Sequence, residues 1–393
     1  MRKISFSIWF YIASIIGLFF YSYTQVDLSL TLSRVSIYQI IEKNFQYIGY
    51  FNRPLSTYCY VGIMILLFVF YIRLLLLAAK AKLLRKTFWF VIIITAVILT
   101  FSYNAFSYDL FNNIFDAKII THYHLNPYQH KALDFPGDPM LSFMHWVQRN
   151  YPYGPIWLLF SAPISFVGMN VFLPTFFLFK ILAGVSYVGG VYYVEKIALQ
   201  VNKKTAVFKA LLFALNPLVL IEGLVSAHND ITMFFFAIFG LYLLFKSKNV
   251  LSGVSLLISI GIKFATIFLL PIFIFVYLMR FFKKKIHWEH VFLWTTLLMV
   301  PALIAVTIRT TFQPWYLLYL LPFGALVGNR FTIIPLIIAS IFALTEYIPF
   351  LYTGNWNPPI PFILNIITFS GLLVSISSIF LIFFFKRAYK VVQ

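Results

Sequence analysis

Charged side chains are scarce in this sequence. Lysine, arginine, aspartate and glutamate make up only 10% of the 393 residues, whereas a soluble domain carries roughly 25%. These charges are too few to cover a soluble surface, and 62% of the residues are hydrophobic. The composition excludes a soluble enzyme, a disordered regulator and a disulfide-rich secreted module. It indicates a membrane protein with several spans.

Cysteine is almost absent, since Cys59 is the only one. One cysteine forms no disulfide within the chain, so the fold does not depend on the redox compartment. Acidic residues are also few, 11 against 30 basic ones, which gives a net charge of +19. Such a charge can indicate nucleic-acid binding. Here the basic residues lie between hydrophobic runs, as in loops that face anionic lipid, so we expect no nucleic-acid partner.

Long apolar runs recur along the whole chain. A membrane helix needs about 20 mostly apolar residues. The first run follows Arg2 and Lys3 and is longer than the apolar core of a signal peptide, so we interpret it as a span. The twelve predicted spans are 4–23, 58–79, 88–107, 173–194, 206–224, 231–246, 250–263, 264–281, 290–308, 314–328, 331–349 and 361–385.

The positions of the basic residues predict the orientation of these spans, because positive charge accumulates in cytoplasmic loops. If both termini are cytoplasmic, twenty of the 30 basic residues fall on that side, and nine of the 11 acidic residues fall outside. The run 156–170 is then predicted to lie at the outer interface, because a full crossing there would put the basic cluster after Lys196 outside. A short full span with reversed topology beyond it is the alternative. The acidic residues predict a polar site on the outer side.

Two carboxylates follow the predicted span 88–107. Asp109 and Asp116 are seven residues apart, so on one helix they share a face, two turns apart. A carboxylate at a membrane edge is costly to desolvate without a use or a partner, and Lys118 is a candidate partner. The pattern predicts a general base for a hydroxyl acceptor, with Asp109 as the first choice. A helix cap with a loop ion pair is the other interpretation.

A second polar cluster follows a span that proline interrupts. Pro217 breaks the run 206–224, and four polar residues come where the chain reaches the outside: Glu222, His228, Asn229 and Asp230. Polar residues at a broken membrane helix usually line a cavity. An ordinary turn between two spans is the alternative.

Ten basic residues contradict the sidedness rule or lie within a span, and three of them are candidates for a phosphate site: Lys180, Lys263 and Arg309. A cation without compensation is costly there, and a phosphate group would offset the cost. Lys263 could instead extend its side chain to lipid headgroups. The aromatic residues Trp315 and Tyr316 follow Arg309 and could simply belong to the interfacial aromatic belt.

Three histidines near Asp116 are candidate metal ligands: His122, His124 and His130. The spacing His-x-His alone is weak evidence for a metal site, so we expect none. No glycine-rich nucleotide-binding loop occurs in a predicted cytoplasmic segment, so we expect no bound nucleotide there.

In their order along the chain, these motifs resemble those of the integral-membrane glycosyltransferases of the GT-C fold that use polyprenyl-phosphate sugars. The sequence is most similar to the bacterial polyprenol-phosphate-mannose-dependent mannosyltransferases and to glycosyltransferase family 87. The matching positions are Asp109 and Asp116, Asn126-Pro127-Tyr128, Tyr153-Gly154-Pro155, Asn216-Pro217-Leu218, His228-Asn229-Asp230, Lys263 and Pro314-Trp315-Tyr316. Three positions depart from the family pattern: Asn112 replaces an Arg, Ala117 replaces a Gly, and Lys180 stands where an Arg is common.

The resemblance implies an all-α polytopic enzyme of the prokaryotic plasma membrane, with its active site on the outer face. It would move a sugar, mannose, from a polyprenyl-phosphate donor to a hydroxyl of a glycan or glycolipid acceptor, with inversion and without cofactor or metal. The implied organisation is an N-terminal hairpin with an outer loop (1–87), a catalytic core (88–328) with the outer loop 108–172, and C-terminal helices (329–393).

The resemblance also implies roles for individual residues. Asp109 and Asp116 are expected to be catalytic. The residues expected to bind the donor phosphate are Lys180, Lys263, Arg309, His228 and Tyr316. Those expected to contact the rest of the substrates are Asn126, Tyr128, Tyr153, Asn229, Asp230 and Trp315.

Two other classes of function are alternatives. A transporter or lipid flippase also has broken spans with charges inside the membrane, but it should show an internal repeat, which is not visible, and charges near the midplane. An oligosaccharide ligase or polymerase would place its large outer loop between late spans, whereas the large loops here come early.

Overall fold

The computed structural model describes residues 2–391, with side chains for residues 6–384. Within this range the chain is helical, and its β pairing is one isolated bridge between Lys131 and Asn150. The helices are α1 (Arg2–Ser22), α2 (Ser36–Gln46), α3 (Arg53–Ala79), α4 (Arg85–Thr100), α5 (Asp109–Thr121), α6 (Pro155–Val167), α7 (Phe172–Val201), α8 (Ala206–Ala214), α9 (Pro217–Leu220), α10 (Asp230–Phe245), α11 (Asn249–Ile262), α12 (Leu270–Phe281), α13 (Trp288–Arg309), α14 (Leu321–Val327), α15 (Arg330–Thr345), α16 (Tyr347–Thr353) and α17 (Ile360–Val391).

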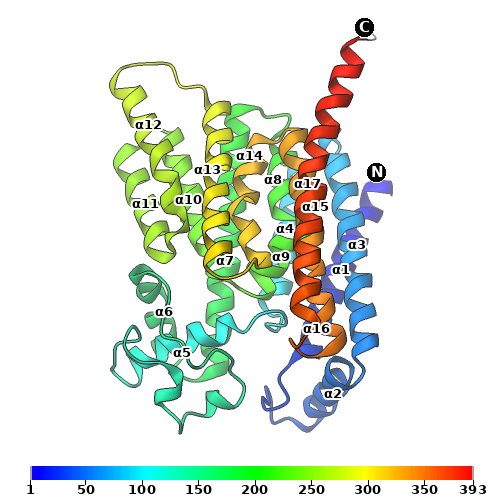
Figure 1. Cartoon of the computed structure of the whole chain (residues 1–393), viewed down its shortest axis with the longest axis vertical. Helices are drawn as coiled ribbons and strands as arrows, with labels where there is room; N and C mark the ends of the chain where they lie inside the picture. Colours follow the sequence, from blue (N-terminus) through cyan, green and yellow to red (C-terminus); the bar gives the residue numbers. More distant parts are fainter. Residues whose placement is uncertain (1, 392–393) are drawn as a thin grey trace.

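The long helices form a bundle, and the loop helices lie at one end of it. Figure 1 shows α2, α5 and α6 at the lower end, and the C-terminus and the turn between α12 and α13 at the upper end. The N-terminus also lies toward the upper end. The acidic motif at the start of α5 and the basic turn after α12 therefore occupy opposite ends of the molecule, as the charge pattern predicts.

All twelve predicted spans contain a helix, but the helices differ in length, and the one in the run 88–107 ends at Thr100. By length and composition, seven helices can cross a membrane, or eight if the bent pair formed by α8 and the segment 217–225 counts as one span. The other four predicted runs form shorter helices: α4, α10, α11 and α14 with the turn before it. An integral membrane protein is thus supported, and the total of twelve spans stays a prediction.

The run predicted to lie at the outer interface forms α6, which is shorter than the spanning candidates. It lies beside α5 below the bundle (Figure 1). Its first turn contacts the end of α11, since the Gly154 amide donates to the Ile262 carbonyl over 3.1 Å. A Cβ atom on Gly154 would lie 2.1 Å from the Gly261 carbonyl oxygen. Only glycine allows this close approach, which brings Tyr153 next to Lys263.

The break after α8 shapes the middle of the bundle. Pro217 has no amide hydrogen, and Asn216 caps the next helix by accepting from the Leu218 amide at 3.0 Å. The chain bends there by 53°. The carbonyl groups freed at the end of α8 accept hydrogen bonds from three buried tyrosine hydroxyls at 2.7–2.8 Å: Tyr11 to Leu215, Tyr71 to Leu212 and Tyr187 to Ala214.

Beyond the break, the chain forms a π-helical segment, η5 (Ile221–Val225). Segments of this kind widen the helix and leave carbonyl groups without their usual partners. The Lys180 ammonium donates to the carbonyls of Leu224 and Val225, the latter at 2.8 Å, and to the Ser102 hydroxyl at 3.1 Å. These bonds fix η5 and turn the following residues toward the start of α5.

Candidate active site

The first catalytic candidate, Asp109, opens helix α5. The Ser107 hydroxyl accepts a hydrogen bond from the Asp109 amide at 3.1 Å, which fixes the first turn. A carboxylate at a helix N-terminus also interacts favourably with the helix dipole. The Asp109 side chain is 15% exposed, so it is shielded by the protein but can still be reached from outside.

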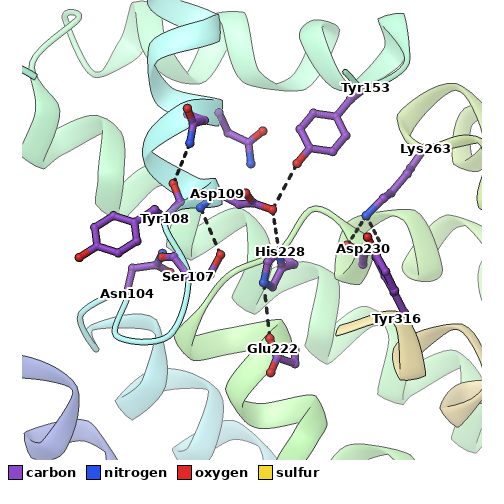
Figure 2. Close-up of polar contacts among 12 residues, drawn as sticks. Asn104, Ser107, Tyr108, Asp109, Tyr153, Glu222, His228, Asp230, Lys263 and Tyr316 are labelled. Carbon is purple, nitrogen blue, oxygen red and sulfur yellow. Dashed lines mark hydrogen bonds and ion pairs between the residues drawn. The ribbon is translucent and has the colours of Figure 1, made fainter. Parts of the chain in front are cut away.

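Three side chains from distant parts of the chain surround the Asp109 carboxylate, and Figure 2 shows two of them, Tyr153 and His228. The Arg149 guanidinium lies 3.4 Å from Oδ1, and the Tyr153 hydroxyl and His228 Nδ1 lie 3.5 and 3.6 Å from Oδ2. Such distances are long for hydrogen bonds. Catalytic contacts are often long in a free enzyme and shorten when the substrate binds.

The second carboxylate, Asp116, lies two turns further along α5 and is buried. Burial raises its pKa to about 7, the positive charge of Arg149 lowers it, and the negative charge of Asp109 raises it. Lys118 is not its partner, because the Lys118 ammonium pairs with Asp138. The periodicity of α5 explains this outcome: Lys118 lies two residues beyond Asp116 and therefore points to another side.

The His228 ring lies between two carboxylates. Its Nδ1 faces Asp109, and its Nε2 lies 3.4 Å from Oε2 of Glu222. The ring stacks on Trp315, with centroids 4.2 Å apart. Trp315 therefore holds the plane of the imidazole, and both ring nitrogens are directed at acids.

An ion pair between Lys263 and Asp230 lies beside the row formed by Asp109, His228 and Glu222. The Lys263 ammonium donates to both oxygens of Asp230, at 2.9 and 2.8 Å. It also lies 5.8 Å from the ring centroid of Tyr153 and 5.9 Å from that of Tyr316, within the range of cation–π contacts. Figure 2 shows Tyr316 next to this pair. Asp230 thus compensates the Lys263 charge. Tyr153 connects this ion pair to Asp109, because its ring lies beside the Lys263 ammonium and its hydroxyl faces the Asp109 carboxylate.

The structure brings together seven of the predicted site residues: Asp109, Tyr153, His228, Asp230, Lys263, Trp315 and Tyr316. The neighbouring Asn229 is 2% exposed, and its amide nitrogen is buried without a hydrogen-bond partner. Arg309 is exposed at the end of α13, close enough for its charge to act on Tyr316.

The remaining predicted site residues contact other groups. The three bonds of Lys180 go to η5 and Ser102, so its ammonium is fully buried within the bundle. Asn126 and Tyr128 are exposed in the loop after α5, where the Asn126 side chain accepts from the Tyr128 amide at 3.0 Å. The Tyr128 hydroxyl donates to the Tyr153 carbonyl at 3.0 Å. Their roles in substrate binding stay predictions.

Two residues at the site had no predicted role. Arg149 contacts Asp109 and lies near Asp116, and its Nε is buried without a hydrogen-bond partner. It is a basic residue in an acidic outer loop, which is the same signal that identified Lys263. Glu222 belongs to the polar cluster at the broken span, but nothing in the sequence indicates that it faces His228.

The candidate metal ligands do not meet. Among the described residues, no group of three or more His, Cys, Asp or Glu side chains is placed to hold a metal ion. His130 lies 3.5 Å from Asp134 in the exposed loop, and His122 packs on Tyr123.

Taken together, the site joins a partly exposed carboxylate to a cluster of cations and hydroxyl groups at one end of a helical bundle. A carboxylate in this position can take a proton, and Arg149, Lys263 and Tyr316 can stabilise negative charge that develops beside it. These features are those of a membrane protein with a candidate acid–base site.

The comparison with known families agrees with this description. Residues 30–280 match the family described as Alpha-(1->6)-mannopyranosyltransferase, N-terminal domain. The match covers more than half of the sequence, and the chain belongs to this family. It is a membrane glycosyltransferase of the mannosyltransferase type, as the motif order predicts. No curated protein and no solved structure matches the chain.

Proposed function

We propose that this enzyme transfers mannose from a polyprenyl-phosphate donor to an acceptor hydroxyl on the outer face of a prokaryotic plasma membrane. Transfer proceeds with inversion at the sugar C1, and Asp109 is the general base. The observation that carries the proposal is the position of Asp109, partly exposed at the start of α5 among Arg149, Tyr153 and His228. The mannosyltransferase family supports the reaction class.

Exposure favours Asp109 over Asp116 as the base. An acceptor hydroxyl has to come within about 3 Å of the carboxylate that takes its proton. Asp109 is 15% exposed, whereas Asp116 is 7% exposed and lies behind it on α5. The proposed role of Asp116 is electrostatic, through its interactions with the charges of Arg149 and Asp109.

The donor phosphate becomes a dianionic leaving group, so cations should gather on its side of the sugar. Lys263, Arg309 and Tyr316 are proposed to bind it, because the Lys263 ammonium lies beside the Tyr316 ring and the Arg309 charge acts on the Tyr316 hydroxyl. Asn229 and Asp230 are proposed to contact the sugar from the start of α10. Asn126 and Tyr128 are proposed to meet the acceptor at the loop surface.

The proposed topology has twelve spans with both termini in the cytoplasm, as in the GT-C fold. The opposite placement of α5 and of the basic turn after α12 supports it (Figure 1). Residues 1–87 and 329–393 are proposed to serve as scaffold around the catalytic core 88–328.

The test is transfer by purified protein in lipid, with a panel of polyprenyl-phosphate sugars and a glycan or glycolipid acceptor. Wild-type protein should transfer mannose, and Asp109→Asn should lower the rate at least about 100-fold, because a general base contributes roughly 10²–10⁴-fold. The folded state of the variant is checked by gel filtration.

Asp134→Asn is the matched control, since Asp134 is an exposed acid of the same outer loop. It should keep the wild-type rate within about twofold. Wild-type turnover in Asp109→Asn would remove Asp109 as the base. Absence of transfer from every donor would contradict the proposed reaction and favour a transporter.

A further inference from the structure

His228 connects Asp109 to a second carboxylate, that of Glu222, which lies deeper in the bundle. Glu222 Oε2 lies 3.4 Å from His228 Nε2, on the opposite side of the ring from Asp109 (Figure 2). The His228 amide also donates to the Glu222 carbonyl at 3.1 Å. One residue pair is thus joined both through the backbone and through the side chains.

Glu222 is fully buried, and a carboxylate inside a membrane protein is costly unless it has partners or a function. Its other oxygen, Oε1, accepts a hydrogen bond from the Tyr347 hydroxyl at 2.8 Å. Oε2 has no hydrogen-bond partner of good geometry, and neither has His228 Nε2. These two atoms face each other, so a proton on Nε2 would allow His228 to donate a hydrogen bond to Oε2 of Glu222.

The groups that face this pair come from several elements. Asp109 of α5 faces Nδ1, and Arg149 and Tyr153 contact Asp109. On the other side, Tyr347 of α16 bonds Glu222, and the charges of Glu222 and Glu346 both act on Tyr347. Tyr60 of α3 also lies within reach of the Glu222 charge.

We infer that Glu222 is a positioning residue that acts through His228 on the proton that Asp109 removes from the acceptor. This inference rests on the proposed function. Glu222 holds the imidazole with its proton on Nε2, which leaves the Nδ1 lone pair directed at Asp109. A carboxylate that fixes an imidazole tautomer in this way is known to matter strongly for rate in acid–base catalysis.

The acceptor oxygen forms a bond to the sugar C1, and the bond between C1 and the phosphate oxygen breaks, with its electron pair leaving on the phosphate. The acceptor proton moves to Asp109 and then to His228 Nδ1. The resulting imidazolium lies between two carboxylates until the proton passes to water at the outer surface and the base is regenerated.

The decisive variant is Glu222→Gln, assayed under the same conditions as the wild type. We expect kcat to fall about 10-fold to 100-fold with KM for the donor unchanged within twofold, since the loss falls on the proton step. The acid limb of the pH–rate profile should move to lower pH, because loss of the Glu222 charge disfavours the imidazolium. Glu222→Asp restores the charge and should bring the limb back.

A double-mutant cycle with His228→Gln separates this role from a structural one. If Glu222 acts through His228, then Glu222→Gln should have little further effect in a His228→Gln background. Additive losses, or a wild-type pH profile in Glu222→Gln, would overturn the inference. The cycle stays informative if Glu222→Gln folds poorly, because Tyr347→Phe removes a bond to the same carboxylate and can replace it.

Glu346→Gln is the matched control. Glu346 is also a buried glutamate, but its bond is with the Thr368 hydroxyl and not with His228. It should keep kcat within about twofold, and an equal loss in this variant would overturn the inference. Wild-type transfer with an unaffected Glu222→Gln contradicts this inference alone, whereas absence of wild-type transfer contradicts the proposed function as well.

Discussion

Asp116 shows how the surroundings of one residue change its chemistry. The residue is an ordinary aspartate in the sequence, seven positions after Asp109. Once it is buried behind Asp109, its pKa rises to about 7, and the nearby Arg149 offsets only part of the rise. Burial therefore leaves the Asp116 carboxyl group partly protonated near neutral pH.

This shift predicts how stability depends on pH. The folded protein holds the Asp116 proton up to about pH 7, whereas the unfolded chain loses it near 3.8, the ordinary pKa of an aspartate. Folding stability from this residue is therefore greatest below pH 4 and is lost as the pH rises to 7. The loss is on the order of 4 kcal/mol at full effect.

Thermal unfolding in detergent checks this prediction. Asp116→Asn should melt close to the wild type at pH 4 and increasingly above it as the pH rises to 8, because asparagine carries no charge to bury. The exposed-acid variant Asp134→Asn should follow the wild type at both pH values. Parallel curves for wild type and Asp116→Asn would contradict the prediction.

At the scale of elements, the break between α8 and α9 positions half of the site. Asn216 and Pro217 interrupt the helix, the chain bends by 53°, and the π-helical segment η5 then carries Glu222 toward His228. A broken helix inside a membrane needs new partners for its freed carbonyl groups. Three tyrosines and Lys180 supply them.

We therefore expect Tyr11→Phe, Tyr71→Phe and Tyr187→Phe each to lower the free energy of unfolding by about 1 kcal/mol. Each change leaves one buried carbonyl without its donor and keeps the ring. Thermal unfolding of the purified variants measures the loss, and the triple variant should lose more than any single one. Tyr58→Phe, at a tyrosine that is 69% exposed, is the control and should be neutral. Equal stability in the triple variant would show that the break does not depend on these bonds.

At the scale of the whole molecule, the distribution of charge divides the protein into two ends. The acids of α5 and its loop lie at one end, and the basic turn after α12 lies at the other (Figure 1). This division follows from the rarity of charge in the chain, because each charged residue has to reach a membrane surface or find a partner.

Cysteine labelling tests the orientation that we propose. Cys59 is exposed and is the only cysteine, so Cys59→Ser gives a cysteine-free background. A membrane-impermeant maleimide should label Asp134→Cys on intact cells and Lys284→Cys only after permeabilisation. The reverse pattern would overturn the outer-face site, and labelling of both on intact cells would contradict the division into two sides.

Part of the candidate site could be predicted from the sequence. Asp109, His228 and Lys263 were identified because charged or polar residues at the ends of apolar runs are rare, and Trp315 was identified from the family resemblance. The partners were less predictable. Arg149 lies 40 residues from Asp109 in the chain, and Glu222 lies 125 residues from Tyr347. Lys118, the predicted partner of Asp116, pairs instead with Asp138.

By itself the sequence determined that this chain is a helical membrane protein with a polar site at one end. Apolar runs of about 20 residues have to form helices in lipid, because each backbone polar group must be satisfied within its own segment. Only the tertiary structure decided which polar side chains meet. The bend after α8, the glycine contact between α6 and α11 and the fold of the outer loop set distances of a few ångströms between residues far apart in the chain, and no local pattern in the sequence encodes those distances.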